Sequence, residues 1–405
     1  MQRLRSLLDR AALHFEEGGR LEKMHAAYEA VDTLLYSPGH VTRTASHVRD
    51  GLDLKRMMSL VIVALLPCVL AAVYNTGYQA SLAISLGASP LDGWQSGLFV
   101  GLGGRFDPGS PLWCSLLGAL YFVPVLLVCY GVGLGIEIVS VALRGHEVSE
   151  GFLVTGMLIP LTLPASIPLW QVGLGTAFGV IFAKEVFGGT GMNFLNPALV
   201  ARAFLFFAYP GDISGEAPWI AADFLDVDNF TGATLLSQAA STPGALADAS
   251  WGDAFVGWVP GSMGETSALA CGVGAAFLIL TQVGSWRTMA GVTLGTFIMA
   301  SLLNWAGSET NPMFSLPFHW HIVLGGWALG TVYMATDPVS SSFTDGGRWL
   351  YGLGIGILTV LIRVVNPAYP EGMMLAILFM NMFAPLIDYF ALQRNIRRRL
   401  ARSAA

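Results

Sequence analysis

A threonine in a long polar loop has the surroundings that attachment of a phosphorylated group requires. The loop, residues 211–263, contains seven acidic residues and no lysine or arginine, and near its middle it reads Asp228-Asn229-Phe230-Thr231-Gly232-Ala233-Thr234. The Thr234 hydroxyl is a nucleophile, and the two small residues before it leave room for a modifying enzyme and a bulky phosphate. Asp228 could orient a metal ion or the hydroxyl during the transfer. The heptapeptide is therefore compatible with a phosphoester on Thr234.

Two plainer interpretations of this heptapeptide stay open. Thr-Gly-Ala-Thr is compatible with an ordinary polar turn, and Asn229-Phe230-Thr231 fits the short N-glycosylation sequon, which is common by chance. The side of the membrane on which the loop lies bears on this choice, so the hydrophobic segments around it matter.

The composition is that of a helical membrane protein. Of 405 residues, 54% are hydrophobic and 12% are charged, against about 25% charged residues in soluble domains. Several apolar runs reach bilayer length, and the short alternating segments of a transmembrane β-barrel are missing. We therefore predict an all-α polytopic fold with about ten transmembrane helices, roughly at residues 57–74, 112–143, 151–163, 169–187, 195–209, 266–284, 287–305, 319–336, 349–365 and 371–390.

The basic residues predict the topology. Of 21 lysines and arginines, nine lie before residue 57 and five after residue 390, and basic residues gather on the cytoplasmic side. With both termini cytoplasmic the number of spans is even, and five crossings put the acidic loop on the outer face. We expect no nucleic-acid partner. The predicted segments are a cytoplasmic N-terminal segment (1–56), a first membrane repeat (57–210), a periplasmic loop (211–265), a second membrane repeat (266–390) and a basic tail (391–405).

The two halves carry similar strings. Trp170-Gln171-Val172-Gly173-Leu174-Gly175 resembles Trp349-Leu350-Tyr351-Gly352-Leu353-Gly354, and an Asn-Pro follows each copy, at Asn196-Pro197 and Asn366-Pro367. With five helices per half, equivalent helices run in opposite directions, as in the inverted repeats of many transporters. Asn-Pro breaks a helix, and such a break survives in a bilayer only where protein or water satisfies the backbone. We therefore expect a site between the halves, although chance similarity and simple loop boundaries remain alternatives.

Two arginines lie within the predicted spans. Arg202 is near the middle of an apolar run, where a charge is costly, so we expect it to face protein or a cofactor. A buried pair with a carboxylate, or bonds to carbonyls at a broken helix, is the plainer alternative. Arg363 is near the outer end of its span, and we expect its side chain to snorkel to the surface.

Three acidic residues are candidates for a sodium path. Glu137, Asp337 and Asp388 lie within or at the ends of predicted helices, and hard cations prefer oxygen ligands. Asp388 could instead form an interfacial pair with the arginines that follow it, and Asp337-Pro338 could be a simple turn at a helix end.

Longer strings identify a family. The chain resembles the B-subunit family of Na⁺-translocating NADH:quinone oxidoreductases along nearly its whole length. The most specific strings are Phe15-Glu16-Glu17-Gly18-Gly19, Lys184-Glu185-Val186-Phe187-Gly188-Gly189-Thr190-Gly191, Asn193-Phe194-Leu195-Asn196-Pro197, Met334-Ala335-Thr336-Asp337-Pro338-Val339-Ser340 and Arg363-Val364-Val365-Asn366-Pro367-Ala368-Tyr369-Pro370-Glu371-Gly372.

The resemblance implies the cofactors and the redox path. It implies FMN bound covalently through its phosphate to Thr234, within a motif that includes Asp228, Thr231, Gly232 and Ala233. The family commonly has serine where this chain has Thr231, a change that leaves the acceptor itself intact. A non-covalent riboflavin is also implied, with electrons passing from NADH on another subunit through the FMN of the C subunit to this FMN, then to riboflavin and ubiquinone.

The resemblance also implies the surroundings and the transported ion. We expect a six-subunit complex with the A, C, D, E and F subunits in a bacterial inner membrane, matured by a flavin transferase, that moves Na⁺ outward. Glu137, Asp388 and Asp337 are then expected on the sodium path, and Arg202 is expected close to the flavin ring or its phosphate, where it would stabilise the reduced anion.

Two other functions remain as alternatives. One is the flavinylated D subunit of an Rnf-type complex, which shares the membrane core but lacks the long basic tail seen here in residues 1–56. The other is a channel or secondary transporter that has the same inverted repeat and no redox chemistry.

Overall fold

The structure is a computed structural model that describes Phe15 and residues 54–144, 151–224, 227, 230–247, 249–366 and 371–403. Asp228 and nearly all of the predicted N-terminal segment 1–56 lie outside the described residues. Helices make up most of the described chain, with only one two-stranded sheet, and its membrane-length helices confirm the predicted polytopic all-α protein.

The first half is built on two long helices. α3 and α5 pack along each other, and α7 packs against both α5 and α8. Each long helix contains a proline, Pro67 in α3 and Pro124 in α5, without being interrupted. The helices are α3 (Leu54–Ser85), α4 (Trp94–Gly101), α5 (Pro111–Arg144), α6 (Gly151–Leu161), α7 (Leu169–Ala183), the 3₁₀ helix η2 (Glu185–Phe187) and α8 (Pro197–Ala208).

The loop between the halves has little regular structure. A two-stranded antiparallel sheet pairs Ser89 with Asp223 and Pro90 with Ala222, which ties the loop to the end of α3. Trp251 of the loop donates to the main-chain oxygen of His319 in the second half (3.0 Å). The elements are β1 (Ser89–Pro90), η3 (Pro210–Asp212), η4 (Ala217–Trp219), β2 (Ala222–Asp223), α9 (Leu235–Ser241) and α10 (Trp251–Val256).

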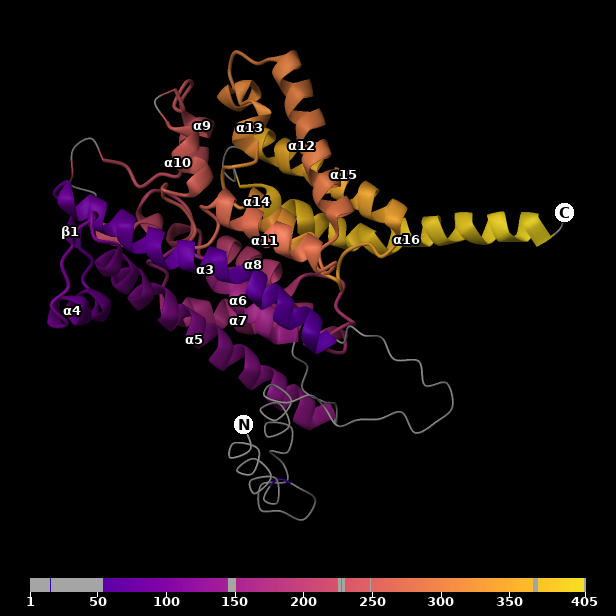
Figure 1. The fold of residues 1–405 in the computed structure, drawn as a ribbon, viewed down its shortest axis with the longest axis horizontal. Coiled ribbons are helices and arrows are strands. Elements are labelled where there is room, and N and C mark those ends of the chain that lie inside the picture. The colour runs from indigo at the N-terminus through magenta and orange to yellow at the C-terminus, as the bar shows by residue number, and fades with distance from the viewer. Residues whose placement is uncertain are drawn as a thin grey trace.

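The second half repeats the packing order of the first. α15 packs against both α12 and α16, just as α7 packs against α5 and α8. The repeated strings therefore lie on helices in corresponding positions. The elements are α11 (Ala268–Leu280), α12 (Trp286–Ala306), η5 (Pro312–Ser315), α13 (Phe318–His321), α14 (Trp327–Leu329), the π-helix η6 (Gly330–Met334), α15 (Asp345–Val365) and α16 (Met373–Ser403). The last helix extends beyond the rest of the chain, at the right of Figure 1.

Five described helices are long and apolar enough to span a bilayer, namely Arg56–Ser85, Pro111–Arg144, Trp286–Ala306, Asp345–Val365 and Met373–Arg402. The predicted helices 151–163, 195–209 and 266–284 correspond to shorter apolar helices. The single helix predicted over 319–336 is wrong. The chain there forms α13, α14 and η6, because Gly325 takes a φ of +62°, in the left-handed region that interrupts a helix.

Glycines allow the closest helix contact in the second half. A Cβ added to Gly352 of α15 would lie 2.5 Å from the main-chain oxygen of Thr288 in α12, and one added to Gly291 would lie 3.0 Å from the oxygen of Trp349. Between helices in lipid, such contact replaces the hydrophobic effect as the source of stability. The glycines of the repeated string are therefore packing residues.

One core joins the two halves. α3 lies beside α11 near the centre of Figure 1, and buried residues of both helices pack with those of η6. Tyr333 of η6 donates to the main-chain oxygen of Ala64 in α3 (2.6 Å). Both α6 and η6 end at fully buried residues, Leu161 and Met334. Side chains of both halves surround two cavities there.

Candidate functional site

Thr234 lines a cavity where the loop meets both membrane halves. The cavity has a volume of about 140 Å³ and opens into further space outside it. Its wall includes Arg202 of α8, Gly261 of the loop, Leu324 and Glu371. We call it the outer cavity. The structure thus brings together the predicted acceptor and the predicted intramembrane arginine, which are 32 residues apart in the sequence.

The motif positions Thr234 through a turn. Thr234 is the N-cap of α9, and its Oγ1 accepts from the Ser237 amide (3.3 Å). Thr231 accepts from the Ala233 amide and donates to a carboxylate oxygen of Glu216, both at 3.1 Å. The turn fixes the position of Thr234 and leaves it partly exposed to the cavity.

Glycine is required at position 232. A Cβ there would lie 2.5 Å from the main-chain oxygen of Glu216 and would overlap the ring of Phe224. Gln238 donates to the main-chain oxygen of Ala233 (2.8 Å), so the next residue is held as well. Thr231, Gly232 and Ala233 therefore shape the turn behind the acceptor, and Asp228, the remaining motif residue, lies outside the described residues.

Arg202 is buried without enough partners. Its side chain is 4% exposed, and its Nε and Nη1 have no hydrogen-bond partner among the described residues. A buried charged donor left unpaired costs more than the roughly 1–3 kcal/mol of a neutral one. No ion pair to Arg202 occurs in the described chain, so the carboxylate pair that the sequence left open is not formed. The guanidinium is available to an anionic group in the outer cavity.

A second cavity lies between the same two halves. It has a volume of about 60 Å³ and is lined by Lys184, Asn193, Asn196, Tyr333 and Asp337, among others. We call it the inner cavity. Amide, ammonium and carboxylate groups converge there against apolar walls, which is the usual composition of a cofactor site.

The predicted break at Asn196-Pro197 forms one edge of the inner cavity. Asn196 caps α8, because its Oδ1 accepts from the amides of Ala198 (3.0 Å) and Leu199 (3.4 Å), and Pro197 fills the first helical position. Asn366 ends α15, and Pro367 lies outside the described residues.

Glu137 is paired rather than free. Lys184 forms a buried ion pair with its Oε1, and Oε2 has no hydrogen-bond partner among the described residues. Lys184 also lines the inner cavity. Asp337 lines it too, while its carboxylate accepts from the Ser340 hydroxyl (2.6 Å) and the Val339 amide (3.3 Å) as part of a turn after η6. Two of the three sodium candidates therefore lie at or next to one cavity.

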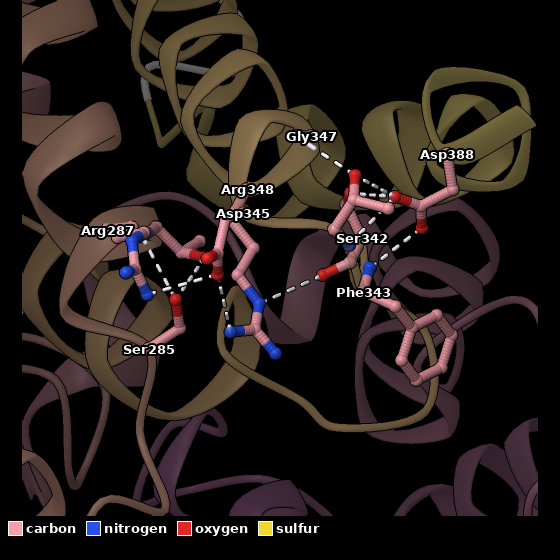
Figure 2. Close-up of polar contacts among 10 residues, drawn as sticks. Ser285, Arg287, Ser342, Phe343, Asp345, Gly347, Arg348 and Asp388 are labelled. Carbon is pink, nitrogen blue, oxygen red and sulfur yellow. Dashed lines mark hydrogen bonds and ion pairs between the residues drawn. The ribbon is translucent and has the colours of Figure 1, made fainter. Parts of the chain in front are cut away.

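Asp388 lines neither cavity, and both of its carboxylate oxygens accept hydrogen bonds. Its carboxylate accepts from the hydroxyls of Ser342 and Thr344 (both 2.6 Å), from the Phe343 amide (2.7 Å) and from the Thr344 amide (3.0 Å). Figure 2 shows Asp388 reaching from its own helix to the loop that begins the preceding helix, α15. The carboxylate thus anchors the start of α15 to α16, and within the described chain it forms no ion pair with an arginine.

Replacing Asp388 with alanine is expected to lower stability. Each hydrogen bond to a charged group contributes about 1.5–3 kcal/mol, and four donors would lose their acceptor, so we expect a clear fall in the Tm of the detergent-solubilised chain. The control is Asp345→Ala, which removes an aspartate that is 68% exposed and pairs with Arg287 and Arg348. Loss of Na⁺ stimulation at an unchanged Tm would contradict the anchoring role.

Arg363 does not snorkel, so that prediction is wrong. The side chain is 0% exposed, and it donates to the main-chain oxygens of His321 (2.8 Å), Leu324 (2.9 Å) and Glu371 (3.0 Å). The broken helix before it leaves the carbonyls of His321 and Leu324 without helical partners, and the guanidinium satisfies them.

The repeated string already contained a signal that Arg363 is a buried cation. Lys184 and Arg363 each stand 14 residues after the tryptophan that begins its copy of the repeated string. Each is a buried cation at the end of the corresponding helix. Lys184 was not among the predicted site residues, and neither were Glu265 and Glu371, which line the outer cavity.

The comparisons with known proteins agree with the resemblance noted in the sequence. The model of the NQR2, RnfD, RnfE family matches residues 41–397. The chain is 55% identical to the B subunit of the Na(+)-translocating NADH-quinone reductase of Chromohalobacter salexigens, over 99% of this chain and 97% of that one. It is 56% identical to the protein of that name from Pseudomonas aeruginosa strain LESB58, over 99% of both chains. The chain belongs to the NQR2, RnfD, RnfE family.

Proposed function

We propose that this chain is the B subunit of a Na⁺-translocating NADH:quinone reductase and that it carries FMN covalently on Thr234. The observation that carries the proposal is the outer cavity, in which a partly exposed acceptor hydroxyl and an unpartnered buried guanidinium occur together. The relatives bear the name of this subunit, and their similarity extends over 99% of the chain.

The residues present fit the flavin phosphate. A phosphate esterified by Thr234 keeps one negative charge, and Arg202 offers two unused donors to it or to the flavin ring. Away from bulk water, such a charge-assisted hydrogen bond is stronger than in water. FMN supplies the ability to take up and release electrons; Thr234 tethers it, and Arg202 balances the added negative charge.

The inner cavity suits a second, non-covalent redox group. Asn193, Asn196 and Asp337 supply donors and acceptors of the kind that flavin ring edges require, and apolar residues of α3 and α6 face them. We assign riboflavin to this cavity. Electrons would then pass from the FMN of the C subunit through the outer and inner cavities to ubiquinone.

The remaining expectations follow from the same assignment. The partners are the A, C, D, E and F subunits in a bacterial inner membrane, with both termini of this chain cytoplasmic and the Thr234 loop periplasmic. Outward Na⁺ transport would involve Glu137 and Asp337 at or beside the inner cavity. Asp388 would influence transport through the loop that it anchors.

The proposal is tested by flavin fluorescence on a denaturing gel. The chain, produced together with the flavin transferase of its own organism, is expected to give a fluorescent band, because a phosphoester survives denaturation whereas a non-covalently bound flavin does not. A dark band under these conditions would favour the non-redox channel or transporter.

Replacing Arg202 with methionine is expected to keep the fluorescent band but to impair electron transfer. Since a charged hydrogen bond contributes about 1.5–3 kcal/mol, the reduced flavin should lose at least that stabilisation, and its midpoint potential should fall. A redox titration of the purified complex measures the shift. Arg397→Met, an exposed arginine on α16, is the matched control. An unchanged potential in Arg202→Met would contradict the role given to this guanidinium.

A further inference from the structure

The outer cavity contains two carboxyl groups that have no role in tethering FMN or in binding its phosphate. Glu265 lies in the loop before α11 and is 3% exposed, and Glu371 lies just before α16. Both line the cavity together with Thr234 and Arg202. A buried pair of like charges is unfavourable unless something compensates it, so the pair requires a physical account.

The two carboxyl groups face each other across one backbone position. A Cβ built on Gly326 would lie 3.0 Å from Oε1 of Glu265 and 3.0 Å from Oε1 of Glu371. The Gly326 amide donates to that oxygen of Glu371. Because residue 326 is glycine, the backbone can approach both carboxyl groups closely.

One carboxyl oxygen of this pair lacks a hydrogen bond. Oε1 of Glu265 has no partner among the described residues, although it is completely enclosed. An ionised carboxylate has only acceptors, whereas a protonated one gains a donor that a neighbouring carboxylate can accept. Uptake of one proton by Glu265 would lower the repulsion and would turn its unpaired oxygen into a hydrogen-bond donor.

The positive charges facing the pair come from two other elements. Arg202 approaches from α8, and Arg363 approaches from α15, where it donates to the main-chain oxygen of Glu371 and contacts Nδ1 of His321 on α13. Burial, together with the neighbouring Glu371, raises the pKa of Glu265 to about 8, and Arg202 opposes this rise. A further negative charge in the cavity would raise the pKa of Glu265 again and favour its protonated form.

We propose that Glu265 and Glu371 form a proton-binding site that takes up one proton when an electron reaches the FMN on Thr234. The inference rests on the proposed function. The electron comes from a reduced flavin on a neighbouring protein of the complex, which is oxidised, and the proton comes from the aqueous phase on the loop side and forms one O–H bond on the carboxyl pair. The charge of the cavity stays constant, and reoxidation releases the proton to the same side.

The test is a redox titration of the covalent FMN in the purified complex at a series of pH values around 8, at fixed Na⁺. In the wild type, the midpoint potential is expected to fall as the pH rises. In Glu265→Gln and in Glu371→Gln this slope is expected to flatten, while Glu309→Gln, an exposed carboxylate, keeps it. Equal slopes in the wild type and both pair variants would overturn the proposal, as would a wild-type potential that does not change with pH.

Infrared difference spectra give a readout that does not depend on turnover. On reduction of the wild-type complex, a carboxylic acid C=O band is expected to appear, and it is expected to be absent in Glu265→Gln. If either glutamine variant fails to fold, Gly326→Ala serves instead, because its Cβ would push both carboxyl groups apart. Persistence of the same band in these variants would overturn the proposal.

The denaturing gel distinguishes a failure of the proposed function from a failure of the proton site. A preparation that has no covalent fluorescence contradicts the proposed function itself. A preparation that has fluorescent FMN on this chain, and an unaltered pH slope in the variants, contradicts the proton site alone.

Discussion

Replacement of Thr234 by alanine will leave the chain without covalent FMN and the assembled complex without quinone reductase activity above background. The reason is geometric. Thr234 is the hydroxyl of the motif that lines the outer cavity, whereas the Thr231 hydroxyl is engaged with Glu216 and the Ala233 amide. Loss of the tether removes the flavin from the electron path, so both gel fluorescence and NADH-dependent quinone reduction should disappear.

Two matched variants control this result. Thr234→Ser keeps a hydroxyl and is expected to retain fluorescence. Thr231→Ala removes two hydrogen bonds of the turn and should at most weaken attachment. Fluorescence in the Thr234→Ala band, or its loss in Thr231→Ala alone, would show that the acceptor had been assigned to the wrong threonine.

The second large effect is expected from Lys184→Met. This change leaves Glu137 buried without its cation, and breaking a buried ion pair by removing one partner costs about 3–5 kcal/mol. The Tm of the detergent-solubilised chain should therefore fall strongly. Because Lys184 also lines the inner cavity, riboflavin content should fall as well.

The double variant Lys184→Met with Glu137→Met distinguishes pairing from a specific need for lysine. Replacement of both partners by apolar side chains of similar size is often close to neutral, so the double variant should recover most of the lost Tm. If Lys184→Met alone is as stable as the wild type, the ion pair does not contribute to stability as inferred.

Most helices could be predicted from the sequence, because apolar length and proline positions largely determine where a membrane helix begins and ends. The broken helix over 319–336 could not, since its composition is as apolar as that of a continuous span. The decisive feature is a single glycine, Gly325, with a left-handed backbone. Arg363 was misjudged for the same reason, because its acceptors exist only where that helix is broken.

Some residues of the candidate site could likewise be predicted from the sequence, and others could not. Thr234 could be found because its neighbours along the chain form the motif, and Arg202 because a charge in an apolar run is conspicuous. Glu265 and Glu371 are brought together by the fold on either side of Gly326, and no local pattern marks them as a pair. For Asp388, residue type indicated an oxygen ligand, but the four donors that occupy its oxygens come from a distant loop.

The attachment of FMN to Thr234 is tested most directly by mass spectrometry of the loop. The wild-type chain is produced together with its flavin transferase and digested, and the peptide that contains Thr231 and Thr234 is fragmented. The account predicts that this peptide gains the mass of FMN less one water and that the fragment ions place the addition on Thr234. An unmodified peptide, or an addition on any other residue, would contradict it.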